Sequence, residues 1–150
     1  MKPYQYRFEK VLNFREQEKT DTEIEFKKSV ESFEIVANEL YEVLKKKEEV
    51  TDKHQQKLRE GFFITDIHQF ANFIDSLEKR IETLQQSVIK ARSKMNWYEE
   101  KLLERSIEVK KYEKMKEKDK EHYRTEMEQT EAIMLDELST LKFQRRETGW

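Results

Sequence analysis

Apolar residues recur along much of this chain at alternating steps of three and four positions. In the first half the repeat occupies Phe26, Val30, Phe33, Ala37, Leu40 and Leu44. This spacing lines up a narrow apolar stripe on one side of an α-helix, which is the pattern of a coiled-coil seam. The repeat keeps its step through Lys47, Thr51 and His54, but these positions are polar, and an apolar residue returns only at Leu58.

A longer and more regular seam follows in the second half. Its members are Phe70, Ile74, Leu77, Ile81, Leu84, Val88, Ala91, Met95, Tyr98 and Leu102. The pattern resumes at Val109 and shifts by one position before the last apolar residues, a shift that locally relaxes a supercoil. Between the seams, Gly61 can end a helix in a left-handed conformation. Asp66, with Gln69 three residues later, has the spacing of a capping box and predicts the start of the next helix.

These features predict an all-α protein that forms one long antiparallel coiled-coil hairpin. We expect a single domain over residues 1–150, with a first helix over about 5–60, a turn over about 61–65 and a second helix over about 66–144. If the helices pair about this turn, facing residues have numbers that add to roughly 127, so that Phe26 faces Leu102. The first helix then ends before the second, and the last ~20 residues of the second helix have no partner.

Composition and charge narrow the possible functions. Charged residues make up 41% of the chain and hydrophobic residues 35%, which is too little apolar material for a globular interior. The formal net charge of -2 gives no long-range attraction to nucleic acid or to anionic membranes. No apolar run approaches the ~20 residues of a membrane span, and no secretory signal is present, so we expect a cytoplasmic protein without direct membrane insertion.

The residues needed for catalysis or metal binding do not come together in this pattern. The chain has no cysteine, and its three histidines, His54, His68 and His122, lie far apart along the predicted helices. Phosphate-binding loops and nucleophile motifs are also missing from the sequence. We therefore expect no cofactor, no metal and no enzyme activity.

Two apolar features remain open to alternative interpretations. Phe62, Phe63 and Ile64 at the turn either cap the hairpin as a small plug or contact a partner. The second feature is an apolar strip near the turn, formed by Phe73, Leu77 and Leu84. The register places it opposite the polar part of the first seam, which would leave the strip open for a protein partner. Alternatively, the alkyl stem of Lys47 covers it and keeps its charge in water.

Residues 6–18 read YRFEKVLNFREQE, and this segment is similar to the opening of flagellar FliJ-type export proteins. Residues 73–82, FIDSLEKRIE, are similar to the family's Phe-Ile-x-x-Leu-Glu-Lys-x-Ile-Glu stretch, and the hairpin layout agrees over essentially the whole chain. The resemblance implies a soluble stalk of the flagellar type III export apparatus, peripherally associated with the flagellar base at the inner face of the membrane. It also implies three partners: a hexameric export ATPase, the cytoplasmic domain of the export gate, and export chaperones.

The resemblance further implies where two of these partners bind. By motif position, the gate-binding residues are Phe73, Leu77, Arg80 and Leu84 on the second helix, with Val43 and Lys46 on the first beside Glu39 and Val50. Arg80, Leu84, Lys46 and Val50 depart from the residue types of the family. The paired termini would enter the ATPase ring, with apolar contacts from Phe8, Val11, Leu12, Met127, Met134, Leu138 and Leu141. We expect a monomer when the chain is free. The alternative function is a coiled-coil scaffold or spacer without a coupling role.

Overall fold

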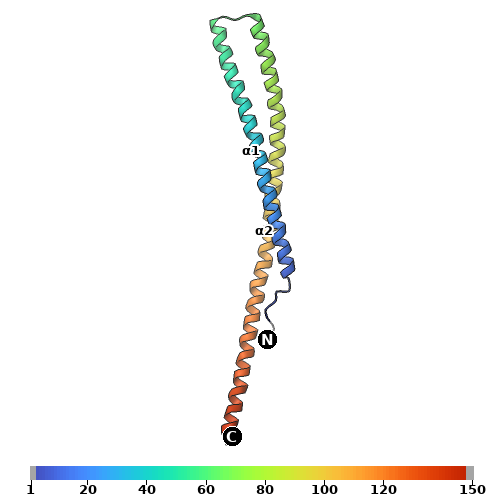
Figure 1. Ribbon diagram of the computed structural model, residues 1–150, viewed down its shortest axis with the longest axis vertical. Helices are drawn as coiled ribbons and strands as arrows, with labels where there is room; N and C mark the ends of the chain where they lie inside the picture. The colour runs from blue at the N-terminus through green and yellow to red at the C-terminus, as the bar shows by residue number, and fades with distance from the viewer. Residues whose placement is uncertain (1–2, 148–150) are drawn as a thin grey trace. The chain divides into compact units, whose positions relative to one another are not determined.

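The computed structural model describes residues 3–147 and contains two α-helices (Figure 1). Helix α1 spans Glu9–Glu60 and helix α2 spans Ile64–Glu147. These two long helices pack against each other, and residues 3–147 include no strand, which confirms the predicted all-α helical hairpin. Compared with the sequence prediction, α1 begins about four residues later, α2 begins two residues earlier, and α2 continues past 144 to Glu147.

The turn between the helices is built by one glycine and one carboxylate. Gly61 has φ +114°, a backbone conformation that favours glycine, and its N–H donates to the Lys57 carbonyl oxygen at 3.0 Å. The Asp66 carboxylate accepts a hydrogen bond from the Phe63 N–H at 3.4 Å. Phe63 therefore holds the N-cap position, and Asp66 is the third helical residue that reaches back to it. The prediction that Asp66 itself starts the helix was wrong, because its side chain supplies the other half of the capping arrangement.

The contacts of the chain divide it into two compact units, to which both helices contribute. We call Thr20–Glu104 the hairpin unit, and Met1–Lys19 together with Arg105–Trp150 the terminal unit. In the hairpin unit, residues 20–60 of α1 run antiparallel to residues 64–104 of α2 and are joined to them by the turn (Figure 1).

The core of the hairpin unit is formed along the predicted seams. Every member of the second seam from Phe70 to Leu102 is buried or half-buried, and Ile81 and Leu84 are the most enclosed of them. On α1, Thr22 and Ser29 are also buried, and the Ser29 hydroxyl donates to the Phe26 carbonyl oxygen at 2.6 Å, which satisfies its hydrogen-bonding need. No side chain between positions 30 and 80 is fully buried, so the helices pack less closely towards the turn.

The observed register differs from the predicted one. Lys47 pairs with Glu78 instead of residue 80, and His54 stacks on Phe70 instead of residue 73. The partners on α2 therefore lie two or three residues closer to the turn than expected. The connection between the helices is shorter than predicted, because α2 begins at Ile64 and not at residue 66. The midpoint of the turn therefore lies earlier in the sequence, which shifts the pairing.

The terminal unit begins with a segment that is not helical. Residues 3–8 precede α1 and lie against α2, where Tyr6, Leu12 and Val109 form a small buried cluster. The sequence prediction of helix from about residue 5 was wrong here, because a non-helical backbone with a turn at residues 7–8 brings aromatic side chains of this segment onto α2. In α2, no side chain in residues 124–147 is fully buried. Within residues 3–147, neither helix has a stretch long and apolar enough to cross a membrane.

Candidate functional site

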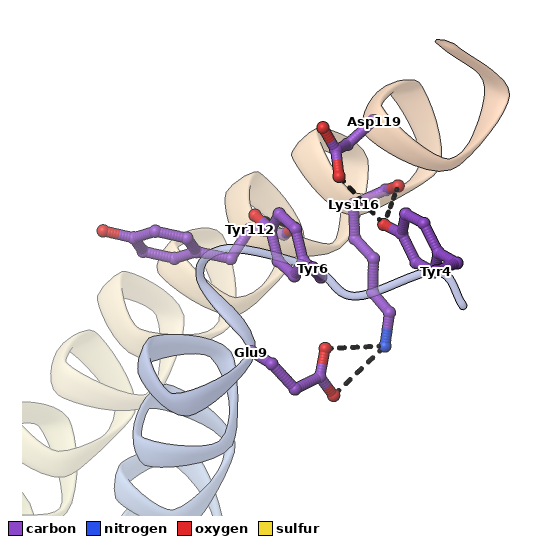
Figure 2. A network of polar contacts seen from close by, with 6 residues as sticks. All are labelled: Tyr4, Tyr6, Glu9, Tyr112, Lys116 and Asp119. Carbon is purple, nitrogen blue, oxygen red and sulfur yellow. Dashed lines mark hydrogen bonds and ion pairs between the residues drawn. The ribbon is translucent and has the colours of Figure 1, made fainter. Parts of the chain in front are cut away.

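Residues 3–8, which we call the N-terminal strap, are fastened to α2 by tyrosine hydroxyls (Figure 2). The Tyr6 hydroxyl donates to the backbone oxygen of Tyr112 at 3.1 Å. The Tyr4 hydroxyl lies within hydrogen-bonding distance of the Asp119 carboxylate at 3.1 Å and of the Lys116 backbone oxygen at 3.4 Å. Hydrogen bonds to charged acceptors are stronger than neutral ones, so Asp119 strengthens the hold on Tyr4.

Lys116 joins the strap to the first turn of α1. Its ammonium contacts both carboxylate oxygens of Glu9 (Figure 2). The two distances are 3.0 Å and 3.2 Å. The rings of Tyr4 and Tyr123 have centroids 5.3 Å apart, and those of Phe8 and Tyr112 are 6.4 Å apart, both in tilted arrangements that aromatic pairs favour. Aromatic and polar contacts therefore bind the strap to the same side of α2.

The environment of the strap raises the pKa of two phenols. Burial is the main cause for both Tyr4 and Tyr6, because it disfavours the charged phenolate. The Asp119 carboxylate raises the pKa of Tyr4 further through the hydrogen bond and through its negative charge, and its charge acts in the same direction on Tyr6. Both tyrosines are therefore protonated donors at neutral pH.

Beyond the strap, α2 continues as residues 124–147, which we call the C-terminal segment. It contains four of the residues predicted to face the ATPase. Met134, Leu138 and Leu141 are all more than half exposed, whereas Met127 is half-buried and lines a hollow shared with Tyr4. The seam therefore continues into this segment, and from Met134 onwards no part of residues 3–147 covers it.

The three remaining residues predicted to face the ATPase belong to the packing of the terminal unit. Leu12 is only 3% exposed, and Phe8 and Val11 are half-buried. Phe8 packs against the buried cluster that contains Leu12. These three side chains pack inside the terminal unit. The exposed apolar surface of this unit comes from the C-terminal segment.

The predicted gate-binding residues lie in the hairpin unit and differ in exposure. Phe73 is 40% exposed, and the Lys46 ammonium lies 5.8 Å from the centre of its ring, within the range of a cation–π contact. Arg80 is exposed and lies 3.9 Å from the Glu39 carboxylate. The structure therefore brings together residues of the two helices that the family resemblance had selected separately.

The other gate-binding candidates are less available. Leu84 is 5% exposed and is part of the core, while Leu77 and Val43 are half-buried. Lys47 is half-buried, and its ammonium pairs with the exposed Glu78 at 3.4 Å, so the alternative in which its alkyl stem covers part of the strip stays open. The neighbouring Lys46 lies over the Phe73 ring, and Leu84 is in the core, so the accessible part of the strip is Phe73 and part of Leu77.

The turn offers a second exposed apolar group. Phe63 and Ile64 are 77% and 74% exposed, and Phe62 is 48% exposed. The alternative of a plug that caps the hairpin is therefore wrong for this structure. Among residues 3–147, no group of three or more potential ligands is arranged to hold a metal ion.

Sequence reasoning missed the strap, although the sequence contains a signal for it. Tyr4, Tyr6 and Phe8 alternate with polar residues, and a period of two indicates an extended segment with one apolar side. The partners of the strap on α2 lie more than 100 positions away in the sequence, so no local pattern reveals them.

Comparison with known proteins agrees with the resemblance of the two sequence motifs. The family described as "Flagellar FliJ protein" matches residues 4–148. A relative in Bacillus subtilis (strain 168), also named Flagellar FliJ protein, is 37% identical over 140 residues, which cover 93% of this chain and 95% of the relative. No solved structure matches the chain. A family match over nearly the whole described chain and a relative of this similarity show that the protein belongs to the flagellar FliJ family.

Proposed function

We propose that this flagellar export component is a stalk that couples the hexameric export ATPase to the export gate. The observation that carries the proposal is that this member of the family has two separate exposed surfaces suited to binding other proteins. One apolar surface lies at the C-terminal segment, and a separate mixed surface surrounds Phe73. A coupling protein needs two such surfaces on one chain, whereas a spacer needs neither.

The C-terminal segment is the proposed contact with the ATPase. Met134, Leu138 and Leu141 share one side of α2, and exposed apolar groups of this kind mark protein-binding surfaces. The strap binds α2 just before the segment, through its bonds to Lys116 and Asp119. A single exposed helix is also slim, at about 10–12 Å with its side chains, which suits entry into the opening of a ring.

The region around Phe73 is the proposed contact with the gate. Phe73 and Arg80 are residue types that are enriched at protein interfaces, and both are accessible. Lys46 shields one face of the Phe73 ring, and a partner can replace this contact with its own apolar group. The proposal also includes transport of export chaperones and a cytoplasmic location at the base of the flagellum, both of which rest on the family.

The ATPase contact is tested with the purified ATPase and the full chain. Serine at Met134, Leu138 and Leu141 together should reduce the stimulation of ATP hydrolysis. The concentration of the chain that gives half of the maximal stimulation should rise by on the order of tenfold or more. The matched control places serine at Phe143, which is similarly exposed but, by helical spacing, lies on the far side of α2 from the seam. An equal loss of stimulation in both variants, or no loss in either, would show that the seam does not contact the ATPase.

The gate contact is tested with the isolated cytoplasmic domain of the gate. Alanine at Phe73 and Leu77 together should weaken binding by on the order of tenfold, because two central apolar groups are lost. Alanine at Ile35 and Ile89, which are exposed elsewhere on the hairpin unit, is the control. Normal binding of the gate by the first variant, with its helical content intact, would refute this assignment.

A further inference from the structure

The C-terminal segment has a seam but no partner helix within residues 3–147. Its positions continue the alternating steps of three and four through Met127, Glu131, Met134, Leu138 and Leu141. The three apolar members from Met134 onwards are 52–55% exposed. This exposed apolar stripe can therefore pack against one further helix.

After Arg124, which pairs with Glu121 in the same helix, the charges of the segment are divided between its two halves. Residues 125–137 carry five acidic side chains and no basic one, at positions 126, 128, 131, 136 and 137. Residues 138–147 carry three basic side chains, Lys142, Arg145 and Arg146, and a single acidic one, Glu147. A helix with this division is complementary to an antiparallel copy of itself, because each acidic half then meets a basic half. A parallel copy would instead place like charges opposite each other.

We propose that the C-terminal segment binds the same segment of a second copy of this chain, as an antiparallel helix pair with two-fold symmetry. Such an interface is self-complementary, as a two-fold contact requires. The inference depends on the segment alone and not on the proposed ATPase contact.

The seam fixes the register of this pair. Met134 lies opposite Leu138 of the second copy, and Leu141 lies opposite Glu131 of the second copy. In this register Glu128 flanks the seam beside Lys142 of the second copy, and symmetry repeats the ion pair at the other end. Within the described part of the single chain, Glu128 makes a long contact to Arg124, at 4.0 Å, which a second copy can replace.

One position opposes the association. Glu137 lies beside the seam near the two-fold axis, where it approaches Glu137 of the second copy, and like charges there are repulsive. The paired region is also short, about three turns on each side of the axis. The association is therefore reversible, and the free chain is a monomer when dilute and a dimer when concentrated.

Sedimentation velocity of the full chain over a series of concentrations tests the proposal. The sedimentation coefficient should rise with concentration in the unchanged chain. Glu128→Lys and Lys142→Glu, each alone, should weaken association by at least about threefold, and the double variant should restore it. An equal mixture of the two single variants should also associate, because in the mixed pair each position 128 again meets a position 142 of opposite charge. Glu137→Gln should strengthen association by removing the repulsion at the axis.

The direction of pairing has its own test, because the chain contains no natural cysteine. A mixture of Met127→Cys and Arg145→Cys chains should form mixed disulfides in preference to disulfides between identical chains, since these positions lie opposite each other only in the antiparallel pair. A chain that stays monomeric at all concentrations would overturn the proposal. A dimer that is indifferent to both charge reversals, or one that links identical cysteine variants preferentially, would overturn it as well.

Discussion

Replacing Leu84 by alanine tests the hairpin unit where its core is best formed. Leu84 is 5% exposed and lies one turn from Ile81, the other well-buried member of the second seam. Loss of a buried leucine costs about 2–5 kcal/mol in compact cores. A two-helix layer leaves water close to any cavity, so we expect the lower part of that range, about 2–3 kcal/mol. For a chain of this length, the corresponding fall in Tm is about 4–12 °C.

Urea unfolding followed by helical circular dichroism measures the difference. Leu84→Ala should lower the midpoint and leave the slope with denaturant unchanged, since the same surface is exposed on unfolding. Phe73→Ala is the matched control on the same helix, and because Phe73 is 40% exposed and its loss leaves no enclosed cavity, it should cost less than Leu84→Ala. Gate binding by folded Leu84→Ala should stay near normal. A loss below about 0.5 kcal/mol in the free energy of unfolding, or a larger loss for Phe73→Ala, would refute this description of the core.

Two further predictions concern the turn and the strap. Gly61→Ala should destabilise the hairpin unit by about 1–2 kcal/mol in urea unfolding, because φ +114° is unfavourable for alanine although the space for its Cβ is open. Gly61→Asn should cost less, and equal stability of all three chains would contradict the strain at this position. Above pH 10 the strap should detach, because the raised pKa values of Tyr4 and Tyr6 mean that the folded state holds these protons more tightly than the unfolded state. Its stability is complete below the ordinary pKa of 10.0 and is lost as pH rises through the folded values, so the near-ultraviolet dichroism of tyrosine should show a transition that weakens in Tyr6→Phe.

The elements of the fold were predictable wherever local spacing decides the structure. The second seam, Gly61 at the turn and the two-helix hairpin follow from periodicity and from backbone preferences that act over a few residues. The register was less accessible, because it depends on where α2 begins, and the Phe63 cap moved that point by two residues. Thr22 and Ser29 were not predicted as core positions because polar residues are usually exposed. Ser29 can be buried because its hydroxyl hydrogen-bonds to the backbone of its own helix.

The candidate surfaces were predictable only in part. The exposed Met134, Leu138 and Leu141 were expected from helix lengths alone, and Phe73 was correctly expected to be accessible. Leu84 shows where motif position is insufficient, because burial is a property of the pair of helices. The strap could not be placed, since its bonds to Lys116 and Asp119 join positions more than 100 residues apart.

The central claim is that one chain must carry both proposed surfaces in order to couple the ATPase to the gate. The most direct measurement is swimming of cells that lack the native chain and that express two variants together. One variant lacks residues 127–150, and the other has alanine at Phe73 and Leu77. Coupling within one chain predicts that neither variant alone nor the two together restores swimming, whereas the unchanged chain does. Restoration by the two variants together would show that the two surfaces act independently and would contradict the coupling role.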